Sequence, residues 1–152
     1  MKTSSLALCA ALLGASLLAS GPAQAQFARA DDAIKYRQAA FTLMSHQMGR
    51  LAAMAQGKAP FDAQTAQASA RAVDLIAHLP WDAFPAGSNT GAAKVKGDPW
   101  KDAEDFAKLQ AALKAQTSKL ASSAGSLETL RTQVGATSQA CRDCHEKYRQ
   151  VR

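Results

Sequence analysis

The sequence contains 152 residues, of which 47% are hydrophobic, 20% are charged and 6% are aromatic. This length suits one domain, and the composition excludes a disordered or collagen-like chain. The formal net charge is +6, but acidic residues are interleaved with the basic ones, so we interpret the charge as an aid to solubility and to attraction of an acidic partner, and predict no nucleic-acid binding. Abundant alanine and few β-branched residues favour helices over sheets.

Residues 1–25 are predicted to be a cleaved signal peptide. Lys2 precedes a short apolar run from Leu6 to Ala19, and Ala23-Gln24-Ala25 matches an A-x-A cleavage site. The run is too short to cross a bilayer comfortably, and no later apolar stretch approaches the length of a membrane span. We therefore expect residues 26–152 to form one exported, soluble domain that does not bind a membrane.

The first two helices are predicted from apolar residues that recur at spacings of three and four. The first helix begins near Asp31 or Asp32, each a plausible N-cap, and ends before Gly57. Its predicted inner face consists of Ile34, Arg37, Phe41, Met44, Met48, Leu51 and Ala55. The second helix begins near Asp62 and ends before Pro80. Its apolar residues are Val73, Ile76 and Leu79.

A long loop and two more helices are predicted in the second half of the chain. Residues 80–99 are rich in glycine and proline, which is typical of a loop. The third helix begins near Asp102, and its apolar residues are Phe106, Leu109, Leu113 and Leu120. The fourth begins at Ser126, and its inner face consists of Leu127, Leu130, Val134, Thr137, Cys141, Cys144 and Tyr148. Four helices joined in this way predict an all-α, antiparallel four-helix bundle.

The chemically informative residues form one pentapeptide, Cys141-Arg142-Asp143-Cys144-His145. This C-x-x-C-H pattern is the attachment signature of a c-type haem. On a helix the two thiols can reach two vinyl groups of one porphyrin, and His145 can supply a ligand to the iron. The predicted export is consistent with this, because haem c is attached outside the bacterial cytoplasm. The motif predicts one covalently attached haem c as the cofactor.

Three other interpretations of the motif compete with haem attachment. A disulfide between Cys141 and Cys144 would strain a helix and leave His145 without a role. A zinc site would need further ligands, and His46 and His78 are isolated in the sequence. A thioredoxin-like pair belongs at a helix start after a strand, whereas this motif lies near the end of the chain.

The mature chain resembles the class II c-type cytochromes, and specifically the cytochrome c′ family. The resemblance covers nearly all of it and is carried by four segments. These are Gln26-Phe27-Ala28, Lys35-Tyr36-Arg37-Gln38, Leu79-Pro80-Trp81, and Cys141 to Arg149. The C-terminal position of the haem motif in a four-helix chain distinguishes this class from small cytochromes whose motif lies near the N-terminus.

The resemblance implies a largely high-spin, five-coordinate haem in which His145 is the only protein ligand of the iron. The opposite face is then covered by Phe41, where relatives often carry Leu or Met. Arg37 and Gln38 match the family's haem-contacting pair. A mostly buried Arg37 needs an acidic partner, which a haem propionate would provide. Arg149 matches the basic residue beside the proximal imidazole.

Two further residues are candidates for the cofactor pocket. Trp81 is expected to pack near the haem edge from the long loop. Met44 shares the helix face of Phe41, and a methionine there is usually a core residue. The class also contains low-spin members in which a first-helix methionine ligates iron, so the alternative is a Met44-ligated cytochrome that acts only in electron transfer.

The resemblance implies a periplasmic protein that binds nitric oxide and carbon monoxide and can exchange electrons with a periplasmic redox partner. An apolar pocket without a hydrogen-bond donor selects uncharged diatomic gases. No distal histidine and arginine pair is evident around Phe41, so we expect no peroxidase or other enzyme. A homodimer through the first two helices is expected. Ala39, Ala40 and Leu43 are the candidate contact residues, although packing inside the protein is an equal alternative for them.

Overall fold

The computed structural model describes residues 27–150, so the predicted signal peptide, residues 1–25, lies outside the described residues. The chain forms α1 (Ala30–Ala55), α2 (Ala63–Ile76), α3 (Ala103–Ser123) and α4 (Leu127–Tyr148). Two short 3₁₀ turns, η1 (Trp81–Ala83) and η2 (Gly91–Ala93), lie in the loop between α2 and α3. Within residues 27–150, no helix is long and apolar enough to span a membrane.

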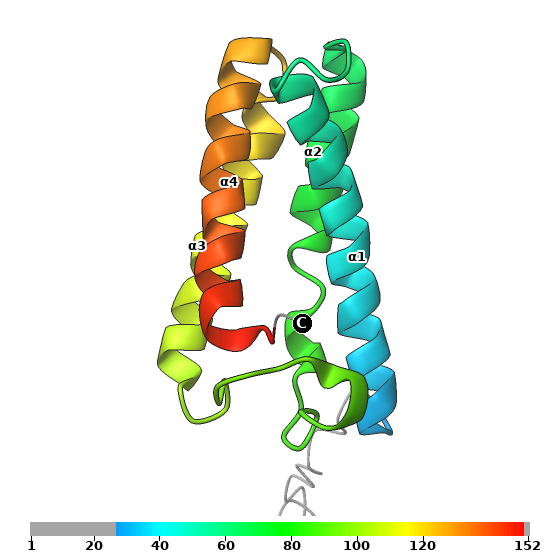
Figure 1. Cartoon of the computed structure of the whole chain (residues 1–152), viewed down its shortest axis with the longest axis vertical. Helices are drawn as coiled ribbons and strands as arrows, with labels where there is room; N and C mark the ends of the chain where they lie inside the picture. The colour runs from blue at the N-terminus through cyan, green and yellow to red at the C-terminus, as the bar shows by residue number, and fades with distance from the viewer. Residues whose placement is uncertain (1–26, 151–152) are drawn as a thin grey trace, which may run out of the picture.

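The four helices run up and down in chain order and form an antiparallel bundle (Figure 1). The pair α1 and α2 lies beside the pair α3 and α4, and each helix packs against its two neighbours. The short connections between α1 and α2 and between α3 and α4 are at one end of the bundle, and the long loop between α2 and α3 crosses the other end. The predicted all-α four-helix bundle is confirmed.

Side-chain capping accounts for where two of the helices begin. Asp62 accepts a 2.7 Å hydrogen bond from the Thr65 amide at the start of α2, and Ser126 accepts one from the Thr129 amide at the start of α4. The sequence predicted Ser126 as a cap and Asp62 as the approximate start of its helix. The prediction for α1 was wrong, because Arg29 is the N-cap and both aspartates lie in the first turn. In the first turn their negative charges interact favourably with the positive end of the helix dipole and stabilise α1, although neither residue caps it.

The apolar core fills the end of the bundle where short connections join α1 to α2 and α3 to α4. Leu51, Leu120, Leu130 and Val73 are fully buried, and each comes from a different helix. Burial of such side chains stabilises the fold by roughly 1.5–3 kcal/mol each. Leu79 was expected on the inner face of the second helix, but α2 ends at Ile76 and Leu79 is 43% exposed. The backbone before Pro80 disfavours further helix.

The long loop closes the other end of the bundle and is held to the last residues of the described chain. Trp100 donates a 2.9 Å hydrogen bond from Nε1 to the carbonyl oxygen of Phe84 within this loop. Val95 and Arg149 form an isolated antiparallel bridge. The loop and the end of α4 therefore hold each other in place beside the open half of the bundle.

Candidate functional site

The three side chains of the C-x-x-C-H motif lie near the end of α4 and line one cavity of about 630 Å³. Cys141, Cys144 and His145 are each partly buried, and both thiols are free. The disulfide alternative is therefore not realised here. His145 is the only histidine lining this cavity, whereas His46 and His78 are exposed. Among residues 27–150, no group of three or more His, Cys, Asp and Glu side chains is placed to hold a metal.

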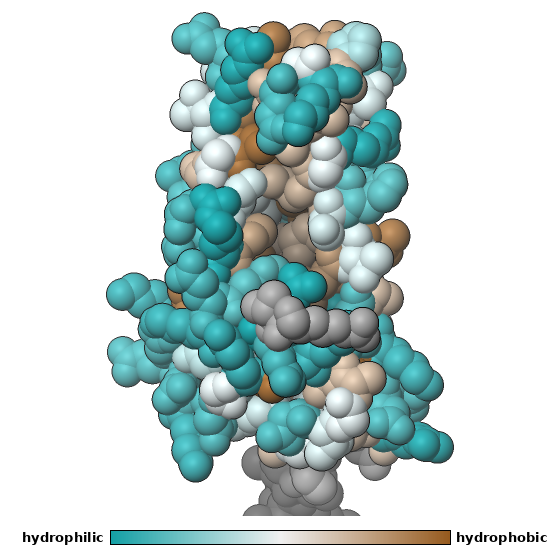
Figure 2. Space-filling model, viewed as in Figure 1, coloured by the Kyte–Doolittle hydropathy of each residue, from teal (hydrophilic) through white to brown (hydrophobic). Residues whose placement is uncertain are grey.

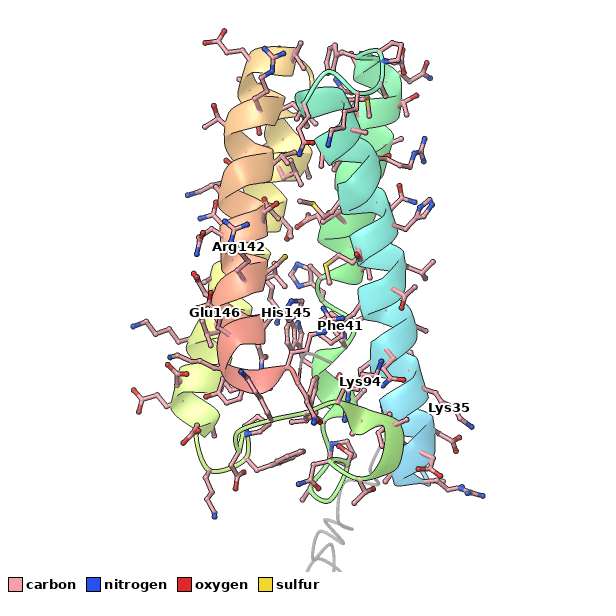
Figure 3. All side chains as sticks on the ribbon, viewed as in Figure 1. Lys35, Phe41, Lys94, Arg142, His145 and Glu146 are labelled. Atoms are coloured by element: carbon pink, nitrogen blue, oxygen red, sulfur yellow. The ribbon has the colours of Figure 1, made fainter. Side chains whose placement is uncertain are left out.

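The opposite wall of the cavity comes from α1. Phe41, Met44 and Met48 line it, and Met44 is 5% exposed. His145 and Phe41 extend toward each other from α4 and α1 (Figure 3). The surface between the two helix pairs is hollowed, with an apolar floor and a largely polar rim (Figure 2). A slot between an imidazole and a phenyl ring is thus part of the fold.

A chain of aromatic rings forms the cavity wall beside the long loop. Trp81 lies edge-on to Phe41 and to Phe106, with ring centroids 5.9 Å and 6.0 Å apart. Phe106 is in turn edge-on to Tyr148, with the centroids 5.2 Å apart. The Trp81 indole donates a 2.7 Å hydrogen bond to the carbonyl oxygen of Ala77, which fixes the ring. The prediction that Trp81 faces the site agrees with this position. Phe84, which stacks on Trp81 at 6.4 Å, was missed.

Arg37 is buried, as predicted, and its hydrogen bonds within the described chain run to the long loop. Its Nη1 atom donates to the carbonyl oxygen of Ala83 at 2.8 Å and to the Ser88 hydroxyl at 2.7 Å, and Nη2 donates to the Ser88 carbonyl oxygen. The guanidinium also lies over the Phe84 ring, 4.4 Å from its centroid. Burial lowers the pKa of Arg37. The acceptors of this cation within the described chain are therefore uncharged oxygen atoms of the long loop.

The neighbouring Gln38 also ties α1 to the loop. Its side-chain nitrogen donates a 2.6 Å hydrogen bond to the carbonyl oxygen of Ala92, in η2. Both Arg37 and Gln38 line the cavity, as the family resemblance implied, and both also hold the loop that borders it. The loop residue Ser88 is completely buried by these contacts, and sequence analysis did not identify it.

Arg149 is the C-cap of α4 and lines the same cavity as His145. Its backbone is held by the bridge to Val95, and its amide donates to the His145 carbonyl oxygen. Burial, together with the positive charge of Arg149, lowers the pKa of His145. The structure thus places a cation near this imidazole, in the position that the family resemblance implied.

The electrostatics of the cavity are set by burial and by cations. Burial raises the pKa of Cys141, and raises that of Cys144 to about 11, so both thiols are protonated at neutral pH. The basic residues that line the cavity are Arg37, Lys94 and Arg149, and none of its lining residues is acidic. The space is therefore suited to an apolar group that carries negative charge at its edge.

Comparison with known proteins identifies the family. A family model described as Cytochrome C′ matches residues 32–149. A cytochrome c′ from Rubrivivax gelatinosus is 41% identical over 128 residues, which are 82% of this chain and 99% of that protein. This chain belongs to the cytochrome c′ family.

Solved cytochrome c′ structures have the same fold. The structure from Rubrivivax gelatinosus matches with a TM-score of 0.79 at 40% identity and covers 82% of this chain and all of that one. A nitric oxide complex of a cytochrome c′ variant from Alcaligenes xylosoxidans matches with a TM-score of 0.78 at 36% identity, covering 84% of this chain and all of that one.

Members of the cytochrome c′ family carry a covalently bound haem c. The residues present here fit that group, because two thiols and an imidazole share one wall of a mostly apolar slot. Cations without acidic neighbours lie at its edge, where the carboxylates of a porphyrin need partners.

Proposed function

We propose that this cytochrome c′ binds small uncharged gases, nitric oxide and carbon monoxide, at a five-coordinate haem c. The observation that carries the proposal is the cavity in which Cys141, Cys144 and His145 face Phe41 across one slot. Cys141 and Cys144 would hold the haem covalently, and His145 would be the only protein ligand of its iron. When bound, the haem supplies a metal centre with affinity for diatomic gases.

Phe41 is the residue that selects the ligand. Its ring has no lone pair to donate to a metal and is held edge-on against Trp81. An apolar ring in this position excludes water and charged ligands, whose desolvation is unfavourable, and admits small neutral molecules. The nitric oxide complexes of the Alcaligenes xylosoxidans relative support the same class of ligand for this chain.

We also propose that the protein is periplasmic and acts as a binding and electron-carrying protein, not as an enzyme. In support, the wall around Phe41 contributes no histidine to the cavity lining. The exposed cation Arg142 offers attraction to an acidic redox partner. Lys147 contributes less to that attraction, because it is paired with Asp105 at 2.8 Å.

A homodimer through α1 and α2 is part of the proposal. Leu43 on α1 is 57% exposed and Leu75 on α2 is 70% exposed. Burial of these side chains against a second copy of the chain would stabilise the dimer. Ala39 is exposed and remains a candidate for this contact. Ala40 is 6% exposed and belongs to the protein's own core, which is the alternative that the sequence left open for it.

The experiment that tests the proposed function is the absorption spectrum of the purified mature protein, oxidised, reduced and with carbon monoxide added. We expect covalently bound haem, a high-spin ferric spectrum and a large change when carbon monoxide binds the reduced form. A sulfur–iron charge-transfer band would instead assign Met44 as a second axial ligand and make electron transfer the sole function. Protein without covalent haem after proper maturation would overturn the proposal.

A further inference from the structure

Lys94 has a backbone conformation that is unusual for a lysine. It follows η2 and has φ = 50°, the one positive φ of a non-glycine residue among residues 27–150. This left-handed region is strained for a residue with a Cβ and is normally occupied by glycine or asparagine. Strained residues persist only where the surrounding structure imposes the conformation, and they are concentrated at ligand sites.

The surrounding structure imposes this conformation through hydrogen bonds on both sides of the bridge between Val95 and Arg149. The Gln150 amide donates a 2.9 Å hydrogen bond to the carbonyl oxygen of Lys94, and the Lys96 amide donates one of 3.2 Å to the carbonyl oxygen of Tyr148. Val95, which follows Lys94, is the residue paired with Arg149. The position of Lys94 is therefore tied to the end of α4, which carries the haem motif.

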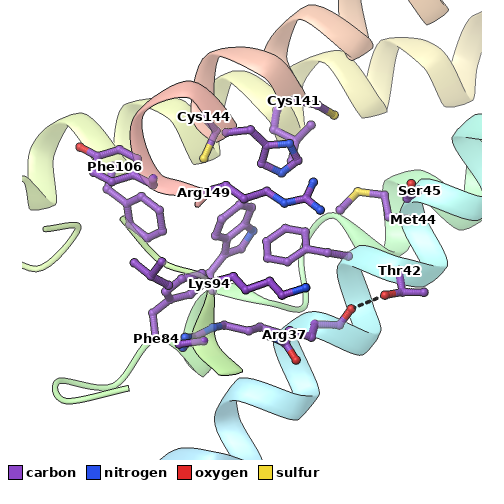
Figure 4. Close-up of a pocket in the computed structure, with 18 of the residues that line it drawn as sticks. Arg37, Thr42, Met44, Ser45, Phe84, Lys94, Phe106, Cys141, Cys144 and Arg149 are labelled. Atoms are coloured by element: carbon purple, nitrogen blue, oxygen red, sulfur yellow. Dashed lines mark hydrogen bonds between the residues drawn. The ribbon is translucent and has the colours of Figure 1, made fainter. Parts of the chain in front are cut away.

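The side chain of Lys94 is directed into the cavity. It lines the cavity, and in Figure 4 it runs beside the side chain of Arg149, with both charged ends pointing into the space between α4 and α1. The guanidinium of Arg37 lies instead toward Phe84 and is occupied by Ala83 and Ser88. Lys94 is thus available for a ligand in a way that Arg37 is not.

Lys94 has no carboxylate partner within the described chain. The ion pairs of residues 27–150 are Arg29 with Asp31, Lys101 with Asp98, and Lys147 with Asp105. None of the residues that line the cavity is an aspartate or a glutamate. An ammonium group aimed into an acid-free cavity is a binding site for an anion that enters from outside the chain.

We propose that Lys94 binds a carboxylate at the mouth of the cavity, namely a propionate of the haem. This inference rests on the proposed haem site and replaces Arg37 with Lys94 as the main cation for that carboxylate. The strained backbone is the means by which the loop keeps the ammonium group over the cavity. The bridge to Arg149 keeps it in register with α4.

The test compares Lys94→Met, Lys94→Arg and Lys96→Met in the haem-loaded protein. Lys96 is an exposed cation of the same loop that does not line the cavity, so it controls for loss of general positive charge. The measurement is the reduction potential as a function of pH, in which ionisation of a haem carboxylate produces a break at its pKa. Haem content and carbon monoxide binding are recorded for every variant.

We expect Lys94→Met to raise the carboxylate pKa by about one unit, because an opposite charge nearby favours the ionised form. Lys94→Arg should keep the wild-type value, and Lys96→Met should move it by much less. Lys94→Met with haem and gas binding intact but a carboxylate pKa equal to that of Lys96→Met would overturn the assignment of Lys94 alone. Wild-type protein that lacks covalent haem would overturn the proposed function itself.

Discussion

Arg37 on α1 donates a 2.7 Å hydrogen bond from Nη1 to the hydroxyl oxygen of Ser88 in the long loop. The two residues are far apart in the sequence, and they are 2% and 0% exposed. A buried guanidinium without acceptors would destabilise the fold, so this contact both satisfies the cation and anchors the loop. The edge of the cavity beside the loop is thereby built from α1.

Replacement of Arg37 by alanine should lower the free energy of unfolding of the haem-loaded protein by about 3 kcal/mol, because three charge-assisted hydrogen bonds to the loop are lost together. Urea denaturation measures this. Arg50→Ala is the control, since Arg50 is exposed on the same helix and its one side-chain hydrogen bond within residues 27–150 is to Gln47 at 3.4 Å. Equal unfolding midpoints for the two variants would show that Arg37 does not anchor the loop.

Phe41→Ala should speed carbon monoxide binding to the reduced protein by about tenfold, which corresponds to a barrier lowered by about 1.4 kcal/mol. The reason is the loss of the ring that faces His145 across the slot. Stopped-flow or flash photolysis gives the rate. His46→Ala, an exposed change on α1, should leave it unaltered. A wild-type rate in Phe41→Ala would remove Phe41 from the role of distal cover.

Gly97→Ala should weaken the bridge between the loop and the end of α4. Gly97 has φ = 66°, and an added Cβ would lie 2.9 Å from the Lys147 carbonyl oxygen. Gly91→Ala is a matched control, because Gly91 also has a positive φ, 56°, but open space around a Cβ. Both variants should lose about 1 kcal/mol of stability through backbone strain.

Only Gly97→Ala should lose more than about 1 kcal/mol of stability, because the Lys147 carbonyl group cannot move away from the added Cβ without disturbing α4. Thermal unfolding of the two haem-loaded variants gives the comparison. If Gly97→Ala were no less stable than Gly91→Ala, the close approach of the loop to α4 would have no energetic importance.

Asp105 should contribute a pH-dependent part of the stability. Its carboxylate accepts hydrogen bonds from Lys147 at 2.8 Å and from the Tyr148 hydroxyl at 2.9 Å, and these hold its pKa below the ordinary value. A carboxyl whose pKa is lower in the folded state stabilises the fold above its unfolded pKa of about 3.9. This contribution is lost as the pH falls through the lowered folded value.

Asp105→Asn should therefore be less stable than wild type at neutral pH, and the difference should shrink below about pH 4. Urea denaturation at a series of pH values measures it. Asp82→Asn is the control at neutral pH, because Asp82 is an exposed loop carboxyl and belongs to none of the ion pairs of residues 27–150. A difference between wild type and Asp105→Asn that grows toward acid pH would contradict the assignment.

Leu43→Glu should weaken self-association by about tenfold or more, because burial of a leucine contributes roughly 1.5–3 kcal/mol. Sedimentation velocity over a range of protein concentrations measures the change. Ala111→Glu places the same charge at an exposed position of α3, outside the proposed interface, and should leave association as in wild type. Equal dissociation constants for the two variants would place any dimer contact elsewhere.

Most of the fold could be predicted because helical periodicity and capping are local properties. Asp62 and Ser126 each precede their helix and have no equally good neighbour, so both helix starts were predicted correctly. Asp31 and Asp32 are adjacent and equally suited to capping, and the structure uses neither as the cap. The end of α2 was placed too late because an apolar Leu79 continues the helical pattern without being packed.

For the site too, residues with a local sequence signal could be predicted, and residues placed by long-range contacts could not. Cys141, Cys144 and His145 could be found from their spacing alone, and Phe41 from the family resemblance. Ser88 and Lys94 could not, because the path of an irregular loop depends on contacts with α1 and α4 that leave no periodic signal. For Phe84, the one available signal was its spacing of three residues from Trp81.

The two principal walls of the cavity come from α1 and α4, the first and last of the helices within residues 27–150. Bringing the ends of a polypeptide together lowers its conformational entropy, and a prosthetic group joined to one end and packed on the other offsets that loss. A group that binds only the folded chain also stabilises it. The bound haem therefore links α4 to α1. Variants that hold the haem less tightly should unfold at a lower temperature and should also bind gases differently.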